Sequence, residues 1–417
     1  LILALVVIVI GGIGSIRGSL VAAIIVGLLD TVGRGFLPGL LVSILPRTLA
    51  NAVGPALASM LIYLLMAAIL LFRPRGLFPA AGAGHESQAA AAERVPLPPR
   101  REWIVGGVFM AVLALVPVGA AYTGQHFYVD LMVRAMIFGI AALSLNLIVG
   151  FGGMVSFGHA AFLGLGAYVV GLSMISGLTN GLAQLALVIA VSAAASCVIG
   201  ALCLRTGGLA FIMITLAFAQ LLYFVGVGLR QFGGDDGFTF RGHSGFGSVL
   251  DLGNPISFYY AVWALLALCL LAIARLINSR FGLALQAIRS NERRAQALGL
   301  PSYRYKLCAF VIAGTICGVA GALLANLTQF VGPAYMHWTR SGELLIMVIA
   351  GGLTSVSGPV LGAVAYLLLE EVLSSYTEYW QLILGPLLVL LVLFARGGIM
   401  STLDIPSWRQ AAGRQRV

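Results

Sequence analysis

Apolar segments of helical length follow one another along the chain, separated by short polar or glycine-rich stretches. After an apolar run at 1–10, the pattern predicts helices near 20–32 and 55–72. It predicts further apolar helices near 103–121, 131–149, 159–176, 182–204, 209–228, 257–278, 307–330, 343–371 and 380–394. Because a helix needs about 20 apolar residues to cross the hydrocarbon core of a bilayer, we expect an all-α, polytopic transmembrane helical bundle.

The composition supports a membrane protein. Hydrophobic residues make up 60% of the chain, charged residues only 9%, and the mean hydropathy is +1.03. A soluble domain carries about 25% charged residues. The net charge of +10 comes from arginines and a single lysine, Lys306, at the ends of apolar runs and in short loops. This placement indicates cytoplasmic loops of a membrane protein, and no nucleic-acid partner is expected.

Two distant parts of the sequence are copies of each other. Residues 341–373 repeat residues 1–33 at a constant offset, with an acidic residue at Asp30 and Glu370. Both copies later reach a positively charged stop, FRPRGL at 72–77 and FARGGI at 394–399. The matched small residues are Gly11 and Gly12 with Gly351 and Gly352, Ser15 with Ser355, and Gly18 with Gly358. A long offset indicates two large homologous units, an organisation common in membrane transporters.

The repeat divides the chain into four regions. Residues 1–78 are expected to be the C-terminal part of a first unit, 79–102 an Ala-, Pro- and charge-rich cytoplasmic linker, and 103–400 a second unit. Residues 401–417 are expected to form a cytoplasmic tail. Because the sequence opens inside an apolar run, we expect the earlier part of the first unit to be missing from it.

Glycine-rich stretches predict broken or re-entrant helices. Gly152, Gly153 and Gly158 interrupt the apolar run before His159, and a glycine pair interrupts each copy of the repeat. Unwound backbone at membrane depth requires surrounding protein or a watery cavity. His159 would then open a half-helix whose positive N-terminus attracts an anionic group; the alternatives are close helix packing through glycine and a hydrogen-bonded packing role for His159. Glu343, before the second glycine pair, is either a functional intramembrane acid or an interfacial residue. Asp30, Glu370 and Glu371 are expected at solvated helix ends.

The most charged stretch, 279–306, predicts an amphipathic helix over 284–298 that is ended by Gly299 and Pro301. Leu285, Ile288, Ala295 and Leu298 are expected to share its apolar face. Such a helix between two spans suits docking into a groove of another protein; the alternative is a helix lying on the membrane surface.

Several catalytic patterns are absent. The sequence has no GxxxxGK[ST] loop, no HExxH and no GxSxG with a plausible triad. The five cysteines include no CxxC pair. We therefore expect no enzyme activity, no cofactor and no metal site.

Four segments carry a resemblance to a known family. They are LNLIVGFGGMVSFGHAAFLGLGAYV, FIMITLAFAQLLYFV followed by GGDDGF, AIRSNERRAQALGLPSYRYKLCAFVIAG and IAGGLTSVSGPVLGA. Residues 103–394 resemble the LivM-type permease of branched-chain amino-acid ABC importers. Residues 1–78 resemble the C-terminal end of the sister LivH-type permease.

The resemblance implies a multi-pass protein of the bacterial inner membrane that passes substrate from periplasm to cytoplasm by ATP-driven alternating access. Its implied partners are cytoplasmic ABC ATPase subunits, a periplasmic substrate-binding protein, a sister permease unit and the lipid bilayer. Positions implied to couple to the ATPases are Arg289, Asn291, Glu292, Arg293, Ala295, Ala297 and Gly299. Positions implied for the substrate pathway or its helix breaks are Asn146, Gly152, Gly153, Ser156, Gly158, His159, Glu343, Gly351, Gly352, Gly11 and Gly12.

A gradient-driven secondary transporter or channel, for a small polar solute such as urea or an amide, is the alternative. It would work without an ATPase and would need acids or histidines buried at mid-membrane, for which only His159 and Glu343 are candidates.

Overall fold

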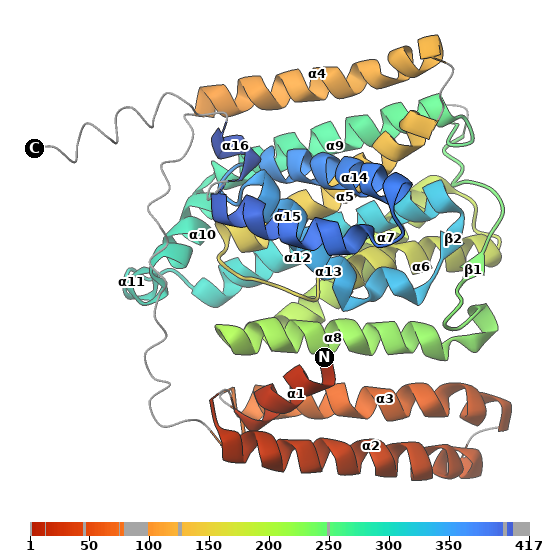
Figure 1. The fold of residues 1–417 in the computed structure, drawn as a ribbon, viewed down its shortest axis with the longest axis vertical. Helices are drawn as coiled ribbons and strands as arrows, with labels where there is room; N and C mark the ends of the chain where they lie inside the picture. Colours follow the sequence, from red (N-terminus) through yellow and green to blue (C-terminus); the bar gives the residue numbers. More distant parts are fainter. Residues whose placement is uncertain are drawn as a thin grey trace, which may run out of the picture. The chain divides into compact units, whose positions relative to one another are not determined.

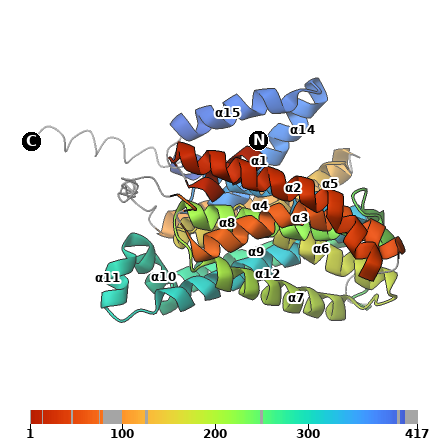
Figure 2. The ribbon, with the colours of Figure 1, turned by 90° about the horizontal axis from the view of Figure 1, so that it is seen from below.

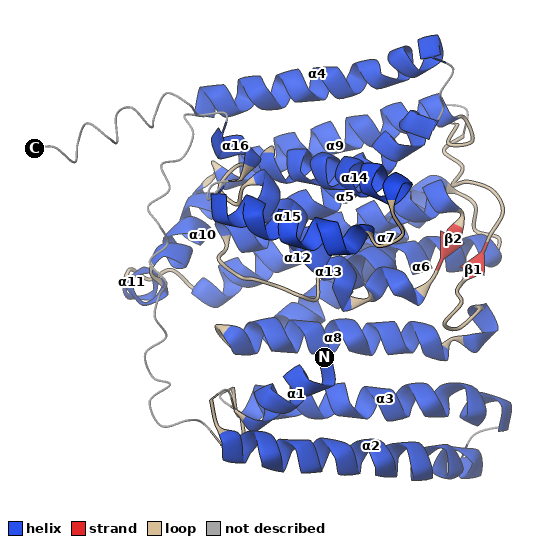
Figure 3. Ribbon diagram, viewed as in Figure 1, coloured by secondary structure: helices blue, strands red, loops and turns tan. Residues whose placement is uncertain are grey.

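The computed structural model describes residues 2–12, 14–44, 47–74, 76–78, 99–123, 127–247, 251–394 and 398–402. Most of the expected linker, 79–98, and the expected tail from 403 onward lie outside these residues. The described chain is almost entirely helical (Figures 1 and 3). Within it, nine helices are long and apolar enough to cross a membrane. The prediction of an all-α polytopic bundle is confirmed.

The chain forms two compact units that interleave along the sequence. Compact unit 1 comprises 1–90, 154–247 and 301–342, and compact unit 2 comprises 91–153, 248–300 and 343–417. The chain therefore passes from compact unit 2 to compact unit 1 at the predicted break after Gly153, where φ is +69°.

Compact unit 1 contains the first copy of the repeat. Its helices are α1 (Ile2–Gly11), α2 (Ile16–Ile44), α3 (Arg47–Phe72), α6 (Ala160–Ile175), α7 (Gly181–Cys203), α8 (Leu209–Gly228) and α12 (Ser302–Thr328). Short elements complete it: 3-10 turns η2 (Arg230–Phe232) and η3 (Pro333–Met336), and the antiparallel strands β1 (Phe238–Thr239) and β2 (Phe330–Val331). Helix α12 packs closely on α6, with Gly166 beside Gly318 and Gly321 beside Leu163. Small residues let helix backbones approach in this way.

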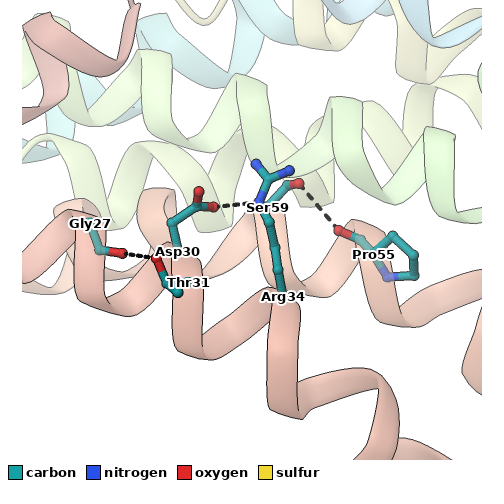
Figure 4. Close-up of polar contacts among 6 residues, drawn as sticks. All are labelled: Gly27, Asp30, Thr31, Arg34, Pro55 and Ser59. Atoms are coloured by element: carbon teal, nitrogen blue, oxygen red, sulfur yellow. Dashed lines mark hydrogen bonds and ion pairs between the residues drawn. The ribbon is translucent and has the colours of Figure 1, made fainter.

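Helix α2 is longer than the sequence pattern predicts. It continues past residue 32 to Ile44, although it contains Pro38. Asp30, expected at a solvated helix end, instead lies inside α2 and forms an ion pair with Arg34 one turn later, at 2.8 Å (Figure 4). An exposed pair of this spacing contributes only about 0.3–0.5 kcal/mol. Helix α2 also packs along α3, and tertiary packing of this kind stabilises helices more than one exposed ion pair does.

Compact unit 2 contains most of the second copy. Its helices are α4 (Pro99–Thr123), α5 (Phe127–Asn146), the π-helix η1 (Leu147–Phe151), α9 (Pro255–Ile277), α10 (Arg280–Ser290), α11 (Glu292–Ala297), α14 (Gly358–Tyr376), α15 (Trp380–Phe394) and α16 (Ile399–Thr402). Helix α13 (Trp338–Gly351) begins in compact unit 1 and continues into compact unit 2. Helix α5 is buried along nearly its whole length and packs against α9 and α14.

A proline explains how α4 attaches to α9. Pro117 has no N–H, so the carbonyl of Leu113 loses its helical donor. The hydroxyl of Tyr259, from α9, donates to that carbonyl at 2.5 Å. Nearby, the indole N–H of Trp263 donates to the carbonyl of Met110 at 3.0 Å. Helix α9 thus satisfies a backbone group that lipid could not.

Replacing Tyr259 tests this contact. In Tyr259→Phe the buried Leu113 carbonyl loses its donor, and we expect the free energy of unfolding to fall by about 1–3 kcal/mol. The neighbouring Tyr260 is the matched control, because its hydroxyl makes an exposed bond of 3.3 Å to Ala114. Denaturation of the detergent-solubilised protein measures both variants. Equal stability of Tyr259→Phe and Tyr260→Phe would contradict the assignment.

Candidate functional site

The glycine pairs form the same turn in both copies of the repeat. Helix α1 ends at Gly11 and α13 ends at Gly351. The next glycine is left-handed in each case, with φ of 106° at Gly12 and 117° at Gly352. Only glycine adopts this conformation without steric cost. The two turns therefore share their backbone geometry as well as their sequence.

A serine holds each turn together. The hydroxyl of Ser15 accepts the N–H of Gly18 at 3.0 Å, and the hydroxyl of Ser355 accepts the N–H of Gly358 at 3.0 Å. These bonds satisfy a backbone donor in the first turn of α2 and of α14, where no helical acceptor exists. The recurrence of serine at this position follows from that requirement.

The turns also require glycine on the facing helix and at the positively charged stop. A Cβ on Gly18 would lie 2.8 Å from the Gly11 carbonyl carbon, and one on Gly358 would lie 3.0 Å from that of Gly351. Gly76 and Gly398 close the turns from the other side: a Cβ on either would lie 2.6 Å from Cα of Gly12 or Gly352, respectively. No role was predicted for these stop glycines from the sequence, although they recur in FRPRGL and FARGGI.

In compact unit 2 the second turn is bonded to the end of α5. Asn146 is fully buried, and its side-chain amide donates to the carbonyl of Ser355 at 2.8 Å. The π-helix η1 follows Asn146 directly, and single π-turns are frequent at functional positions. Within η1, Gly150 lies against the Asn146 side chain and the Leu353 carbonyl. The unwound segment and the glycine turn are thus in direct contact.

Arg289, from the charged stretch 279–306, contacts the same π-helix. The guanidinium of Arg289, in α10, donates to the carbonyl of Gly150. A Cβ on Gly153 would lie 2.9 Å from Cγ of Arg289, so the arginine also packs against the end of the break. Three consecutive contacts in compact unit 2 therefore connect α10, η1, Asn146 and the glycine turn.

The predicted single helix at 284–298 is wrong. Asn291 is extended (φ −159°, ψ 98°), and its side chain caps α11 by accepting the N–H of Arg294 at 2.9 Å. Asparagine favours such a cap over the helix interior, so the segment forms two short helices, α10 and α11, beyond the end of α9 (Figure 2).

The apolar face of this segment is smaller than expected. Leu285, Ile288 and Ala295 are buried as expected, but Leu298 is 77% exposed. The new register after Asn291 turns Leu298 away from the apolar face. Of the positions implied to couple to the ATPases, Glu292, Arg293, Ala297 and Gly299 are exposed in α11 and the turn after it. Gly299 has φ +85°, and the chain there folds back so that Leu300 N–H donates to the Ala295 carbonyl at 3.1 Å.

In compact unit 1, protein groups occupy the start of α6. His159 is fully buried, and its ring packs edge-on against Phe162 with centroids 5.9 Å apart. The N–H of Ala160 donates to the Ser341 hydroxyl at 3.0 Å, and that of Phe157 to Thr215 at 3.3 Å. The Ala160 N–H is therefore bonded to protein, in contrast to the predicted half-helix whose N-terminus faces a watery cavity.

The residues just before α6 are also hydrogen-bonded or closely packed within the protein. Ser156 is fully buried and accepts the N–H of Gly158 at 3.3 Å. A Cβ on Gly158 would run into the Thr215 backbone. This geometry favours the packing interpretation of His159, Ser156 and Gly158.

An ion pair inside compact unit 2 was not predicted. Glu370, expected at a solvated helix end, lies within α14 with its side chain 18% exposed and 3.8 Å from Arg134 of α5. Arg134 also lies over the ring of Phe138 at 5.9 Å. Charged groups at membrane depth are expected to pair in this way. Glu343, the acid predicted to be either functional or interfacial, lies partly buried in α13, two turns before Gly351.

Comparison with known proteins agrees with this architecture. The profile of the family described as "Branched-chain amino acid transport system / permease component" matches residues 127–393. A LivM permease of Salmonella typhimurium is 29% identical over 316 residues, covering 70% of this chain and 74% of the relative. The LivM permease of Escherichia coli K12 is 28% identical over the same shares. Escherichia coli LivH is 28% identical over 147 residues, 34% of this chain and 47% of the relative. No solved structure matched the chain.

The candidate membrane spans among the described residues, together with the LivM and LivH relatives, indicate a multi-pass permease of the inner membrane. The chain belongs to the family of permease components of branched-chain amino-acid transport systems.

Removing the serine of the second turn tests its structural role. In Ser355→Ala the buried N–H of Gly358 loses its acceptor, and we expect a loss of about 1–3 kcal/mol in stability. Ser374→Ala in α14 is the matched control, because the Ser374 hydroxyl is exposed and bonds only locally to the Glu371 carbonyl. Amide hydrogen exchange over 352–360 should accelerate in the first variant alone. Unchanged exchange in Ser355→Ala would show that the serine does not hold the turn.

Proposed function

We propose that this chain is a membrane-spanning permease component of an ABC importer for branched-chain or related small neutral amino acids. Substrate would pass from periplasm to cytoplasm. The LivM and LivH relatives are branched-chain amino-acid permeases by name, which supports the cargo class. A further relative, an L-arabinose ABC transporter permease of Azospirillum brasilense, is 27% identical over 150 residues. Similar permeases thus serve different cargoes, and we assign the choice of cargo mainly to a periplasmic substrate-binding protein.

The observation that carries this proposal is the bond between α10 and η1. The donor Arg289 lies in α10, which is followed by the exposed and charged residues of α11. The acceptor Gly150 lies in the π-helix η1, at a helix break. An ATPase bound at α11 could therefore pull on the break through a charge-assisted hydrogen bond. No sequence pattern of a nucleotide-binding loop occurs in this chain, so ATP hydrolysis is assigned to partner subunits.

The mechanism follows from the connected contacts. ATP-driven closure of two cytoplasmic ATPases would displace α10 and α11. Arg289 would transmit the displacement to η1, and Asn146 would pass it to the turn at Gly351–Gly352. Because the turn pivots on left-handed glycines, small shifts there would redirect α13 against α14. A population shift between outward- and inward-facing arrangements would carry substrate across.

The ATPase partnership is tested by affinity purification from native membranes in mild detergent. ATPase subunits should co-purify with the parent chain and be lost with Gly299→Trp, which forces a bulky side chain into a left-handed position. Glu292→Arg, on the exposed surface of α11, is the second variant and should also lose them. Absence of ATPase subunits from the folded parent would contradict the proposal and favour a gradient-driven carrier.

Arg289 is tested separately from ATPase binding. A charge-assisted bond contributes about 1.5–3 kcal/mol, so Arg289→Ala should lower ATP-dependent uptake roughly 10–100-fold while the ATPase subunits stay bound. Arg280→Ala is the control, because Arg280 is exposed at the other end of the same helix. Normal uptake by Arg289→Ala, measured in reconstituted vesicles, would remove Arg289 from the coupling route.

A further inference from the structure

The last helix of the first copy has a partner within compact unit 1. Helix α3 packs along α8 (Figures 1 and 2). Tyr63 meets Phe224 with ring centroids 5.8 Å apart, and Ala56 lies 3.3 Å from the Cβ position of Gly228. Ala67, one turn beyond Tyr63, is also buried, at 4% exposure. Residues spaced by seven and four share one face of a helix, so this face of α3 is an apolar seam.

Helix α15 is the counterpart of α3 in the second copy. The register is fixed by the sequence match of FRPRGL with FARGGI and by Gly76 and Gly398, which close their turns in the same way. One pair of positions is buried in both copies: Ile62 at 3% exposure and Leu384 at 4%. The two helices therefore turn the same side inward.

The other face of α15 differs from that of α3. Gly385 stands at the position of Tyr63, and no atom of the described residues lies within 4 Å of its Cβ position. Val389 stands at the position of Ala67 and is 59% exposed. Among the described residues, the face that α8 covers on α3 is thus uncovered on α15.

We propose that the face of α15 carrying Gly385 and Val389 docks the helix of a sister permease unit that corresponds to α8. The proposal rests on the proposed function, because it requires a second permease unit. Helix α3, the last helix of the first copy, packs on α8, which belongs to the second homologous unit (103–400). A two-fold relation between homologous permease units would place α15, the last helix of the second copy, on the helix of the sister permease that corresponds to α8. A glycine at the centre of this face lets the partner helix approach closely.

Site-specific photo-crosslinking tests the occupant. Benzoylphenylalanine at Val389 is activated in native membranes, and the cross-linked peptide is sequenced. We expect a peptide from a permease helix homologous to 209–228 but lying outside residues 1–417. The same probe at Val108, 60% exposed on α4, is the control for lipid exposure. Lipid adducts alone at Val389, or a cross-link to α8 of a second copy of this chain, would overturn the proposal.

A second variant separates docking from folding and from the proposed function. Gly385→Trp places a bulky side chain into open space, so this chain should still fold and retain its ATPase subunit while losing the sister permease on purification. Gly107→Trp on α4, where the Cβ position is equally open, should retain both. Retention of the sister permease by Gly385→Trp contradicts the docking surface. Loss of ATPase subunits from the parent chain contradicts the proposed function instead.

Discussion

Every helix break within an apolar protein leaves backbone N–H and C=O groups that lipid cannot bond, and the described part of this chain is organised around satisfying them. Ser15 and Ser355 bond the first turn after each glycine break, Ser341 bonds the start of α6, and Tyr259 bonds the carbonyl freed by a proline. Other buried polar side chains, such as Ser144 and Ser196, bond carbonyls of their own helix.

The need to pair these backbone groups also connects the helix breaks to other elements. Asn146 satisfies a carbonyl of the second turn, and Arg289 satisfies a carbonyl of the π-helix. A hydrogen bond that completes an interrupted helix also ties that helix to another element. The exposed segment around α11 is therefore bonded, through three short steps, to the turn on which α13 and α14 meet. These contacts are the physical basis of the coupling that we propose.

Much of this could be predicted from the sequence. Apolar length and composition were sufficient for the helical bundle, and the glycine pairs located the breaks, because glycine and apolar length act locally. The split at Asn291, the length of α2 and the exposure of Leu298 were not predictable in this way, since capping geometry and helix packing decide them. Glu370 was misassigned because its partner Arg134 is distant in sequence. Arg289 was selected as part of a charged stretch, but only the fold identifies Gly150 as its acceptor.

In the proposed mechanism, Arg289 transmits nucleotide binding at the ATPases to the glycine turn. Amide hydrogen exchange at 352–358, in the assembled transporter with and without a non-hydrolysable ATP analogue, tests it most directly. We predict that the nucleotide changes exchange in this segment in the parent complex, and that the change disappears in Arg289→Ala with the ATPases still bound. Exchange at 352–358 that is insensitive to nucleotide, or a response that persists unchanged without Arg289, would contradict the account.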